Sequence, residues 1–326
     1  MRPSVSVVLP VFNCPHYVGE AIESMLGQTY ADFEMIVIDD GSTDDTPRVL
    51  ERYRDPRIRF HEQKNRGLAA TLNRGIELAR GRYVARQDQD DISLPERFAK
   101  QVAFLDAHAD CALVGTWAQI WKERAPTERA HRHPGDNATL KFELLLNNPF
   151  VHSSMMMRKA ALERIGAYCT DESRQPPEDF ELWSRIAREY AVANIPEMLH
   201  VYREVDSSIS RLGESPFMRN LVTICAENIA WAAETQPSNR HVVNIAALAH
   251  SASDRILGSP DFDSMRDVFG RAAVRVTGGQ TERFAREAQA RINALRYRYW
   301  ELRYGKGWRR HVFRAVRGAS RLMTRI

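Results

Sequence analysis

Three carboxylates lie within four positions of the segment VARQDQDDISLPERF, residues 84–98: Asp88, Asp90 and Asp91. Carboxylates this close repel one another, and burying even one of them is costly. They therefore belong either on an open turn or around a cation. Side chains at i and i+2 of an extended segment face the same way, so Asp88 and Asp90 can share one Mg²⁺ or Mn²⁺ ion. One such residue is enough to cap a helix, so capping alone does not explain three of them.

A second acidic pair ends an apolar run in the segment IVIDDGSTDDTP, residues 36–47. Asp39 and Asp40 precede Gly41, which permits a tight turn, and the polar residues after it can cap a helix. Two interpretations stay open. The acids are turn and cap residues, or they form a ligand site in which a carboxylate accepts hydrogen bonds from a base or a sugar.

A third acidic site is the segment QPPEDFELW, residues 175–183. Pro177 suits a first helical turn, and Asp179 and Trp183 are four residues apart and share a helix face. A helix N-terminus favours the charged form of a carboxylate and lowers its pKa, so an ionised Asp179 is a candidate general base. Alternatively, Glu178 and Asp179 only compensate the helix dipole.

The elements that must position these acids alternate over the first 120 residues. Strand patterns are expected at 4–11, 33–40, 58–63, 82–88 and 111–120, and helices at 17–28, 46–55, 67–81 and 94–108. This alternation predicts an α/β fold with a mainly parallel sheet and helices on both faces. Ligands of such sheets bind at the carboxyl ends of the strands, where the first two acidic clusters lie.

Beyond residue 120 the pattern loosens. We expect a polar loop at 122–138, a helix at 138–148, a strand at 152–159, a helix at 176–190, a strand or strand pair at 191–203, and paired amphipathic helices at 217–234 and 242–257. His131 and His133 lie in the polar loop and receive no role. The predicted divisions are a catalytic domain at 1–205, a helical region at 206–290 and a basic tail at 291–326.

Length and composition set outer limits. The 326 residues suit one large α/β domain with an appendage, or two domains. Four scattered cysteines without a CxxC pair indicate buried free thiols in a reducing compartment. No signal peptide is evident, and no apolar stretch approaches the roughly 18 residues of a membrane span. We therefore expect a cytoplasmic protein, which associates peripherally with the inner face of the membrane if its tail binds lipid.

Taken in order, the acidic motifs and their neighbours resemble the family 2 glycosyltransferases, which have the GT-A fold of nucleotide-diphospho-sugar transferases. The resemblance covers roughly residues 3 to 205. It is carried by VVLPVFN at 7–13, QTYADFEMIVIDDGSTDDT at 28–46, NRGLAATLNRGIELARGRYVARQDQDD at 65–91, LPERFAKQ at 94–101, HSSMMMRKAALERIGAY at 152–168 and EDFELWSRI at 178–186. It implies a Rossmann-like mixed sheet and an inverting sugar transfer from a nucleotide-sugar.

The resemblance also implies roles for single residues. Those expected at the nucleotide are Pro10, Val11, Phe12, Asn13, Asp39, Asp40, Asn65, Gly67 and Asp88. Asp40 is the expected partner of the base, commonly uracil. Asp88-x-Asp90 matches the metal-binding DxD motif, with Asp90 the direct ligand of Mn²⁺ or Mg²⁺, and Asp179 matches the catalytic base. Residues assigned with less support to the acceptor or the transferred sugar are Asp91, Glu178, Trp183 and His152.

The expected acceptor is a hydroxyl of a glycan or a lipid-linked glycan. The processive members of the family carry a QxxRW motif and membrane spans, and this chain shows neither, so we expect it to add one sugar or a few. The serine-rich residues 204–214 are a candidate lid over the donor.

The last residues are strongly basic. From 291 to 326 there are eleven Arg or Lys and one Glu, about +10, against about −6 for the rest of a chain whose net charge is +4. Residues 306–326 separate apolar and basic positions on two helical faces, as an interfacial helix on anionic lipid does. A solvated helix, or one docked on the acidic body, is the alternative. No nucleic-acid motif accompanies the charge, so nucleic acid is not expected.

Other functions remain alternatives. A sugar nucleotidyltransferase also uses paired Asp and Mg²⁺, but VLPVFNCPHY lacks its GxGTRxxP-type loop, and the GxGxxG of a nicotinamide dehydrogenase is also absent. A catalytically degenerate protein that binds nucleotide-sugars is a further alternative, although Asp90 and Asp179 are both present. The sequence does not specify the sugar, the acceptor or the oligomeric state.

Overall fold

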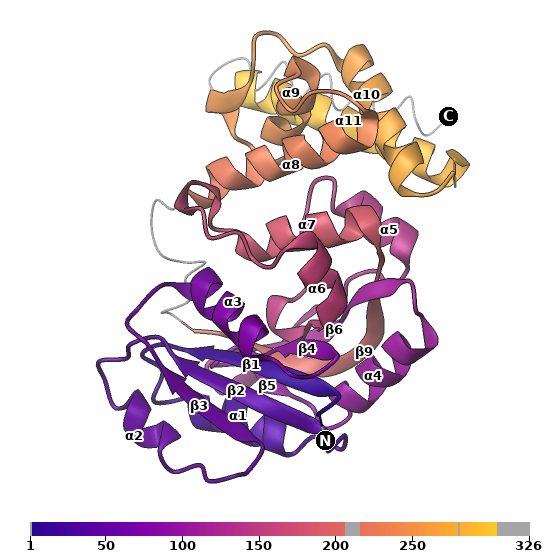
Figure 1. Cartoon of the computed structure of the whole chain (residues 1–326). Coiled ribbons are helices and arrows are strands. Elements are labelled where there is room, and N and C mark those ends of the chain that lie inside the picture. The colour runs from indigo at the N-terminus through magenta and orange to yellow at the C-terminus, as the bar shows by residue number, and fades with distance from the viewer. Residues whose placement is uncertain (1, 206–215, 280, 305–326) are drawn as a thin grey trace. The chain divides into compact units, whose positions relative to one another are not determined.

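A mixed β-sheet forms the centre of the first of two compact units, which divide between Phe217 and Met218. The computed structural model describes residues 2–205, 216–279 and 281–304 (Figure 1). Within them the strand order is β3-β2-β1-β4-β8-β6-β9-β5, with β7 paired to β6. The strands are β1 Val5–Val11, β2 Phe33–Asp39, β3 Ile58–Glu62, β4 Tyr83–Arg86, β5 Ile92–Ser93, β6 Cys111–Lys122, β7 Ala125–His131, β8 Met156–Arg158 and β9 Ala191–Glu204.

The strand directions bring several carboxyl ends to one edge of the sheet. β1 pairs in parallel with β2 and β4, and β6 pairs in parallel with β9. β8 is antiparallel to both β4 and β6, so β6 runs parallel to β4. The predicted mixed, mainly parallel sheet is confirmed, and β1, β2, β4, β6 and β9 all end at the same edge, which we call the carboxyl edge.

Helices cover both faces of this sheet, as predicted. Alternate residues of β1 face opposite sides. α1 (Val18–Leu26) and α4 (Arg97–Ala107) contribute to the core that contains Val7 and Leu9. α3 (Leu68–Leu78) packs on the other face, where a Cβ on Gly75 would lie 2.3 Å from Val8 Cγ1. The remaining helices of this unit are α2 Thr46–Leu50, α5 Asn137–Glu143, α6 Lys159–Ile165 and α7 Glu178–Glu189, with the short 3₁₀ turns η1 His152–Ser154 and η2 Glu172–Arg174.

Part of the predicted polar loop at 122–138 is a strand, so that prediction was wrong. β7 forms a hairpin with β6, in which Ala118 lies opposite His131 and Lys122 opposite Ala125. Its sequence APTERAH has no alternation of apolar and polar residues, because most of the strand is exposed at a sheet edge and buries no face of its own. Pairing with β6 makes this segment a strand, and its own sequence gives no indication of one.

The second compact unit is helical. Its elements are α8 Phe217–Ala233, α9 Arg240–Ala249, the 3₁₀ turn η4 Ser253–Arg255, α10 Phe262–Val276 and α11 Thr281–Tyr304. The helix predicted at 242–257 ends at Ala249, and α11 passes through the predicted division at residue 290 without a break. The proposed lipid-binding helix at 306–326, and most of the proposed lid at 204–214, lie outside the described residues. Among those that are described, no helix is long and apolar enough to cross a membrane.

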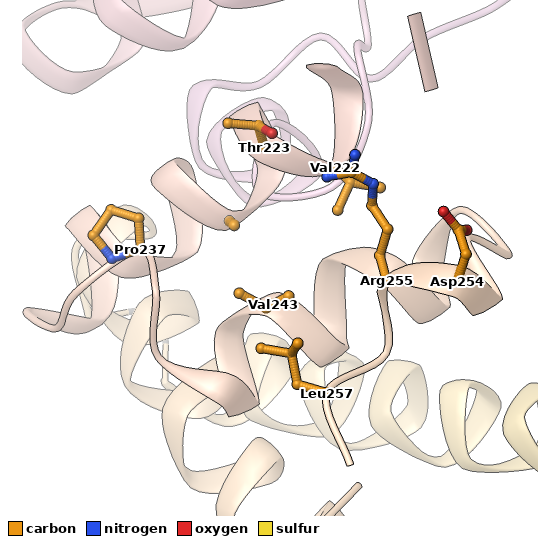
Figure 2. Close-up of a pocket in the computed structure, with 8 residues that line it drawn as sticks. Val222, Thr223, Pro237, Val243, Asp254, Arg255 and Leu257 are labelled. Atoms are coloured by element: carbon orange, nitrogen blue, oxygen red, sulfur yellow. The ribbon is translucent and has the colours of Figure 1, made fainter. Parts of the chain in front are cut away.

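A surface pocket of about 370 Å³ lies within the helical unit (Figure 2). Apolar side chains from α8 and α9 form much of its wall, and Arg255 extends from η4 toward α8. The lining residues are Val222, Thr223, Ala226, Pro237, Val243, Asp254, Arg255 and Leu257. No residue predicted from the sequence to act on substrate or metal belongs to this pocket.

Candidate active site

The ends of β1 and β2 are joined by side chains at the carboxyl edge. Val11 lies beside Asp39 in the parallel register. Asn13 adopts the left-handed φ of 48°, which Asn tolerates. Its N–H donates to Ser42 Oγ at 3.0 Å, and its Oδ1 accepts from the N–H of Thr43 at 2.9 Å. The Asp39 carboxylate is buried and accepts the N–H of Ser42 at 2.9 Å. Two predicted nucleotide-binding segments therefore form one fixed surface.

Asp40 holds the loop that contains Asn65 and Gly67, two further predicted nucleotide residues. Its Oδ1 accepts the N–H of Arg66 at 2.9 Å, and its Oδ2 accepts the N–H of Gly67 at 3.0 Å. Gly41, with φ of 81°, lets the loop approach, since a Cβ there would lie 2.9 Å from the backbone nitrogen of Asn65. Both Asp40 oxygens are thus engaged by protein donors, whereas Asp39 keeps more unused acceptor capacity.

The residue between the two DxD carboxylates ties this motif to β1. Gln89 Oε1 accepts the N–H of Phe12 at 2.8 Å, and Gln89 Nε2 donates to the Phe12 carbonyl at 3.2 Å. Pro10 is buried within β1, whereas Phe12 is 42% exposed. The middle residue of the motif therefore has a positioning role that its sequence gave no reason to expect.

Negative charge is concentrated in the segment 88–91, here called the acidic loop. Burial raises the pKa of Asp90 to about 8, and the neighbouring charges of Asp91 and Asp88 add to the increase. Asp88 forms an ion pair with the fully buried guanidinium of Arg86. No side-chain donor among the described residues contacts Asp90. Its carboxylate is therefore the least compensated negative charge of the loop.

Asp91 differs from its neighbours because it is completely enclosed. Its Oδ1 accepts the N–H of Arg203 at 2.7 Å, and its Oδ2 accepts from Ser153 Oγ and lies 3.1 Å from His200 Nε2. Asp91 and His200 are at most 1% exposed. Asp91 was predicted to lie at the acceptor or the transferred sugar; in this structure its side chain is enclosed by protein and holds the acidic loop in place.

A buried polar network extends from the acidic loop into α4. Arg97 and Gln101 lie one turn apart on the inner face of this helix and are fully buried. Arg97 donates to Gln101 Oε1, Gln87 Oε1, Ser93 Oγ and the carbonyl oxygens of Arg86 and Met155. The sequence-based interpretation missed this network. Its only local signal was two polar residues, four apart, on an otherwise apolar helix face.

The acidic loop fits a divalent cation by its chemistry. Aspartate oxygens are the hard ligands that Mg²⁺ and Mn²⁺ prefer. A cation would compensate the charge of Asp90, which a backbone hydrogen bond and the charge of Arg86 offset too little to prevent the raised pKa. Within residues 2–205, 216–279 and 281–304, no three His, Cys, Asp or Glu side chains form a closed metal cluster. A DxD-type site needs only one or two protein ligands, because substrate phosphates and water supply the others.

The predicted catalytic base lies at the N-terminus of α7, as expected. Asp179 Oδ2 accepts from Asn148 Nδ2 at 2.7 Å, and Asp179 Oδ1 accepts its own helix's Phe180 N–H at 2.7 Å. We expected the helix N-terminus to lower the pKa of Asp179, and that was wrong in direction. Burial raises this pKa, and the Asp88 carboxylate adds to the increase. Burial likewise raises the pKa of Glu178 to about 7, with Asp179 and Asp88 contributing.

Two residues proposed to contact sugar or acceptor are occupied by protein contacts. Trp183 is 0% exposed and packs edge-on against Phe150, His152 and Tyr168, so its ring belongs to the core of this unit. His152 Nε2 lies 2.8 Å from the Tyr168 hydroxyl, and its Nδ1 is 3.9 Å from Glu178 Oε1. Burial lowers the pKa of His152 well below its ordinary value. It is therefore a neutral residue that supports the base-bearing helix.

Comparison with known proteins identifies the family. Residues 6–166 match the model described as "Glycosyl transferase family 2". The chain is 36% identical to EpsE of Bacillus subtilis over 218 residues, 64% of this chain and 76% of that protein. The chain belongs to glycosyl transferase family 2. It is also 31% identical to the amylovoran biosynthesis glycosyltransferase AmsE of Erwinia amylovora, over 63% of this chain and 78% of AmsE.

Solved structures confirm the fold of this family 2 glycosyltransferase. S. aureus TarS residues 1–349, in complex with UDP-GlcNAc, match with a TM-score of 0.61 and 19% identity over 94% of this chain and 93% of that chain. The mannosyltransferase PcManGT from Pyrobaculum calidifontis, in complex with GDP-Man and Mn²⁺, matches with a TM-score of 0.53 and 18% identity over 99% of this chain and 81% of that chain. At such identities the likeness shows the fold alone.

Proposed function

We propose that this family 2 member is an inverting, metal-assisted glycosyltransferase that moves a sugar from a nucleoside-diphosphate sugar to a hydroxyl group. One observation carries the proposal. The acidic loop and the N-terminus of α7 are about ninety residues apart in sequence, yet the Asp88 charge raises the pKa of both Asp179 and Glu178. A candidate metal ligand and a candidate base therefore lie close enough in space to interact electrostatically.

The nucleotide binds, in this proposal, at the fixed surface made by the ends of β1 and β2. Asp39 is the better partner for a donor group of the base, because Asp40 already holds the loop at 66 and 67. The exposed backbone of Asn65 and Gly67 flanks the nucleotide. This arrangement revises the expectation that Asp40 is the direct partner of the base.

Asp90 and Asp88 hold a divalent cation in this proposal, and Asp91 fixes the loop from behind. A bound Mg²⁺ or Mn²⁺ supplies positive charge that stabilises the leaving diphosphate. Arg86 forms an ion pair with Asp88 and so orients that carboxylate. Gln89, bonded to Phe12, keeps the acidic loop in register with the nucleotide surface.

Asp179 accepts the proton of the acceptor hydroxyl as its oxygen attacks the anomeric carbon. Attack from the face opposite the diphosphate inverts the configuration in one displacement. The raised pKa of Asp179 suits this role, because a base is most effective when its pKa approaches the working pH. Asn148 donates to Oδ2 and the N–H of Phe180 donates to Oδ1, and each oxygen keeps a further lone pair that can receive the proton.

The relatives indicate the class of acceptor. AmsE is described by its role in amylovoran biosynthesis, and WbnJ of Escherichia coli, 31% identical over 57% of this chain and 72% of WbnJ, by its role in O-antigen biosynthesis. We infer a glycan or lipid-linked glycan acceptor in the assembly of a surface polysaccharide. For the donor we keep the expectation drawn from the sequence and propose a UDP-sugar.

Calorimetry on the purified chain tests the proposal. UDP-, GDP- and dTDP-sugars are titrated with and without Mn²⁺ into the wild type, Asp90→Ala and the control Asp45→Ala, whose carboxylate is exposed and pairs with Arg48. We expect Mn²⁺-dependent binding of one nucleotide, lost in Asp90→Ala and kept in the control. Binding of no nucleotide by the folded wild type would overturn the proposal. Binding without turnover on any acceptor or water would favour the degenerate alternative.

A further inference from the structure

Three aromatic rings form a cluster near the carboxyl edge that no role above uses. His131, at the end of β7, stacks on His133 with 5.5 Å between ring centroids and an angle of 18° between ring planes. His131 also meets Tyr202 of β9 edge-on, at 5.3 Å and 82°. All three side chains are half-buried. We call these three residues the aromatic platform.

The platform lies on the same face of the sheet as His200, which supports the acidic loop through its contact with Asp91. In the register, Ala118 of β6 lies opposite His131 on one side and opposite His200 on the other. Residues directly opposite one another point to the same face of a sheet. His200 contacts Asp91, and Tyr202 follows His200 by two residues, so it shares that face.

The platform is also connected to the catalytic base. Pro134 follows His133, and Asn194 Nδ2 donates both to the Pro134 carbonyl at 3.0 Å and to the Pro149 carbonyl at 3.1 Å. Asn148, the next residue along, holds Asp179. In the strand order, β6 and β9 lie beyond β4 from the nucleotide strands β1 and β2. The platform is thus on the base side of the site, away from the nucleotide.

The platform is held rigidly by its surroundings. Trp117 Nε1 donates to the His133 carbonyl at 2.8 Å. Arg129 of β7 forms a two-bond ion pair with Glu204 of β9, at 3.0 and 2.5 Å. Such bidentate pairs fix relative orientation. The rings therefore keep their places before any ligand arrives, which reduces the entropy cost of binding.

The chemistry of the rings matches an uncharged, hydroxyl-rich ligand. Burial lowers the pKa of His133 to about 4, with the nearby His131 contributing, and burial also lowers the pKa of His131. A neutral imidazole offers one donor and one acceptor, as sugar hydroxyls do. Among the described residues, neither ring makes a hydrogen bond to protein, and neither has a nitrogen that is buried without a partner. Their polar atoms are therefore open to solvent or ligand.

We propose that His131, His133 and Tyr202 form the subsite that binds the acceptor saccharide. The inference rests on the proposed function, because inversion requires the acceptor to approach from the side opposite the diphosphate. The two imidazoles hydrogen-bond the hydroxyls of a neutral sugar ring, and the aromatic faces pack against its C–H groups. The β6–β7 hairpin thereby contributes to the choice of acceptor.

Ring-preserving substitutions test the subsite. His131→Phe and His133→Phe, singly and together, keep the ring packing and remove the nitrogens. His108→Phe is the matched control, since His108 stacks on Phe104 at the end of α4. Saturation-transfer NMR measures binding of the methyl glycosides of glucose, galactose, mannose and N-acetylglucosamine, with Mn²⁺ and the nucleotide that binds in calorimetry. Nucleotide affinity and donor hydrolysis by water are measured in parallel.

We expect the double variant to lose saccharide affinity by about tenfold or more, the effect of two hydrogen bonds, while nucleotide affinity and donor hydrolysis stay within about twofold. The control should match the wild type in every assay. Equal saccharide binding by the wild type and the double variant would overturn the subsite. So would a wild type that binds nucleotide but none of the four glycosides, and in that case the transferase proposal stands. If the folded wild type binds no nucleotide, both the subsite and the transferase proposal are overturned.

Discussion

The carboxyl edge of the sheet and the helical unit bury different kinds of side chain. At the edge, the side chains that are at most 1% exposed include Arg86, Arg97, Arg203, Asp91 and His200. In the helical unit, the fully buried side chains include Val242, Ile245, Ala246, Phe269, Phe284 and the amide Asn244. No Asp, Glu, Lys or Arg of the described part of the helical unit reaches this degree of burial.

This difference shows that the burial of charged groups costs free energy of folding at the carboxyl edge, and that the helical unit avoids this cost. A buried ion is unfavourable unless hydrogen bonds and counter-charges surround it. Around Asp91 and Arg97 those partners are nearly complete, yet burial still raises the pKa of Asp91 to about 7, as it raises the pKa values of Asp90 and Asp179. The helical unit has apolar packing instead. We therefore expect substitutions at the edge to change chemistry and pH response, and substitutions in the helical unit to change stability.

The largest expected effect is on catalysis. Asp179→Asn keeps the size of the side chain but cannot take a proton, so turnover should fall by about 10²- to 10⁴-fold with unchanged nucleotide affinity. Steady-state rates and calorimetry measure the two quantities. Asp171→Asn, an exposed carboxylate before the same helix, is the control and should be near wild type. More than a tenth of wild-type turnover in Asp179→Asn would remove Asp179 from its role.

A core truncation in the helical unit should act oppositely. Phe269 is 0% exposed, and Phe269→Ala should lower the free energy of unfolding by about 3–5 kcal/mol through lost burial and a cavity. Nucleotide affinity of the folded protein should not change, because the nucleotide residues belong to the other compact unit. Val274→Ala on the same helix, 37% exposed, is the control, with an expected cost below about 0.5 kcal/mol. Urea unfolding measures the free energy of unfolding, and calorimetry measures the nucleotide affinity.

The acidic loop should make stability depend on pH. The pKa of Asp90 is raised from 3.8 to about 8, so between these values the folded chain binds more protons than the unfolded chain. Stability of the metal-free protein should therefore fall as pH rises from about 4 to about 8. Asp90→Asn should weaken this dependence and stabilise the metal-free protein at pH 8 by about 2 kcal/mol, a value discounted for partial solvent screening.

Urea midpoints at pH 5 and pH 8 measure the effect. Mn²⁺ should stabilise the wild type at pH 8 and leave Asp90→Asn much less affected, since a ligand of the folded state stabilises it. If the wild type gained stability between these pH values, with the acidic loop intact, the raised pKa of Asp90 would be wrong.

The smallest effect is a helix cap in the helical unit. Asp261 accepts the N–H groups of Asp263 at 3.1 Å and Ser264 at 3.2 Å at the start of α10. Asp261→Ala should cost about 1 kcal/mol. Asp267→Ala, exposed in the middle of the same helix, should cost less and serves as the control. Equal thermal midpoints for the two variants would show that the cap contributes nothing.

The sequence predicted much of the framework. The alternation of strands and helices, and the acids that end the second and fourth strands, placed Asp39 and Asp88 at one edge, which the structure confirms. It did not predict β7, because an exposed edge strand has no apolar period to detect. His131 and His133 were consequently assigned to a loop, and their stacking beside Tyr202 emerged only from the hairpin.

The buried polar network that supports the acidic loop also could not be predicted from the sequence. Arg97, Ser153 and His200 come from three distant elements, and a single sequence does not indicate which polar residues will meet. The pKa of Asp179 shows the same limit. A helix N-terminus is a local feature and predicted a lowered pKa, but burial by other elements outweighed it and reversed the direction.

By itself, then, the sequence determined the order of the elements, the direction of the sheet and the chemical types at the strand ends, because periodicity and turn residues act over short distances. Only the tertiary structure decided which carboxylates are enclosed, which remain uncompensated, and which rings stack on one another. Burial and electrostatic interaction depend on everything within a few ångströms in space, and those neighbours are contributed by remote parts of the chain.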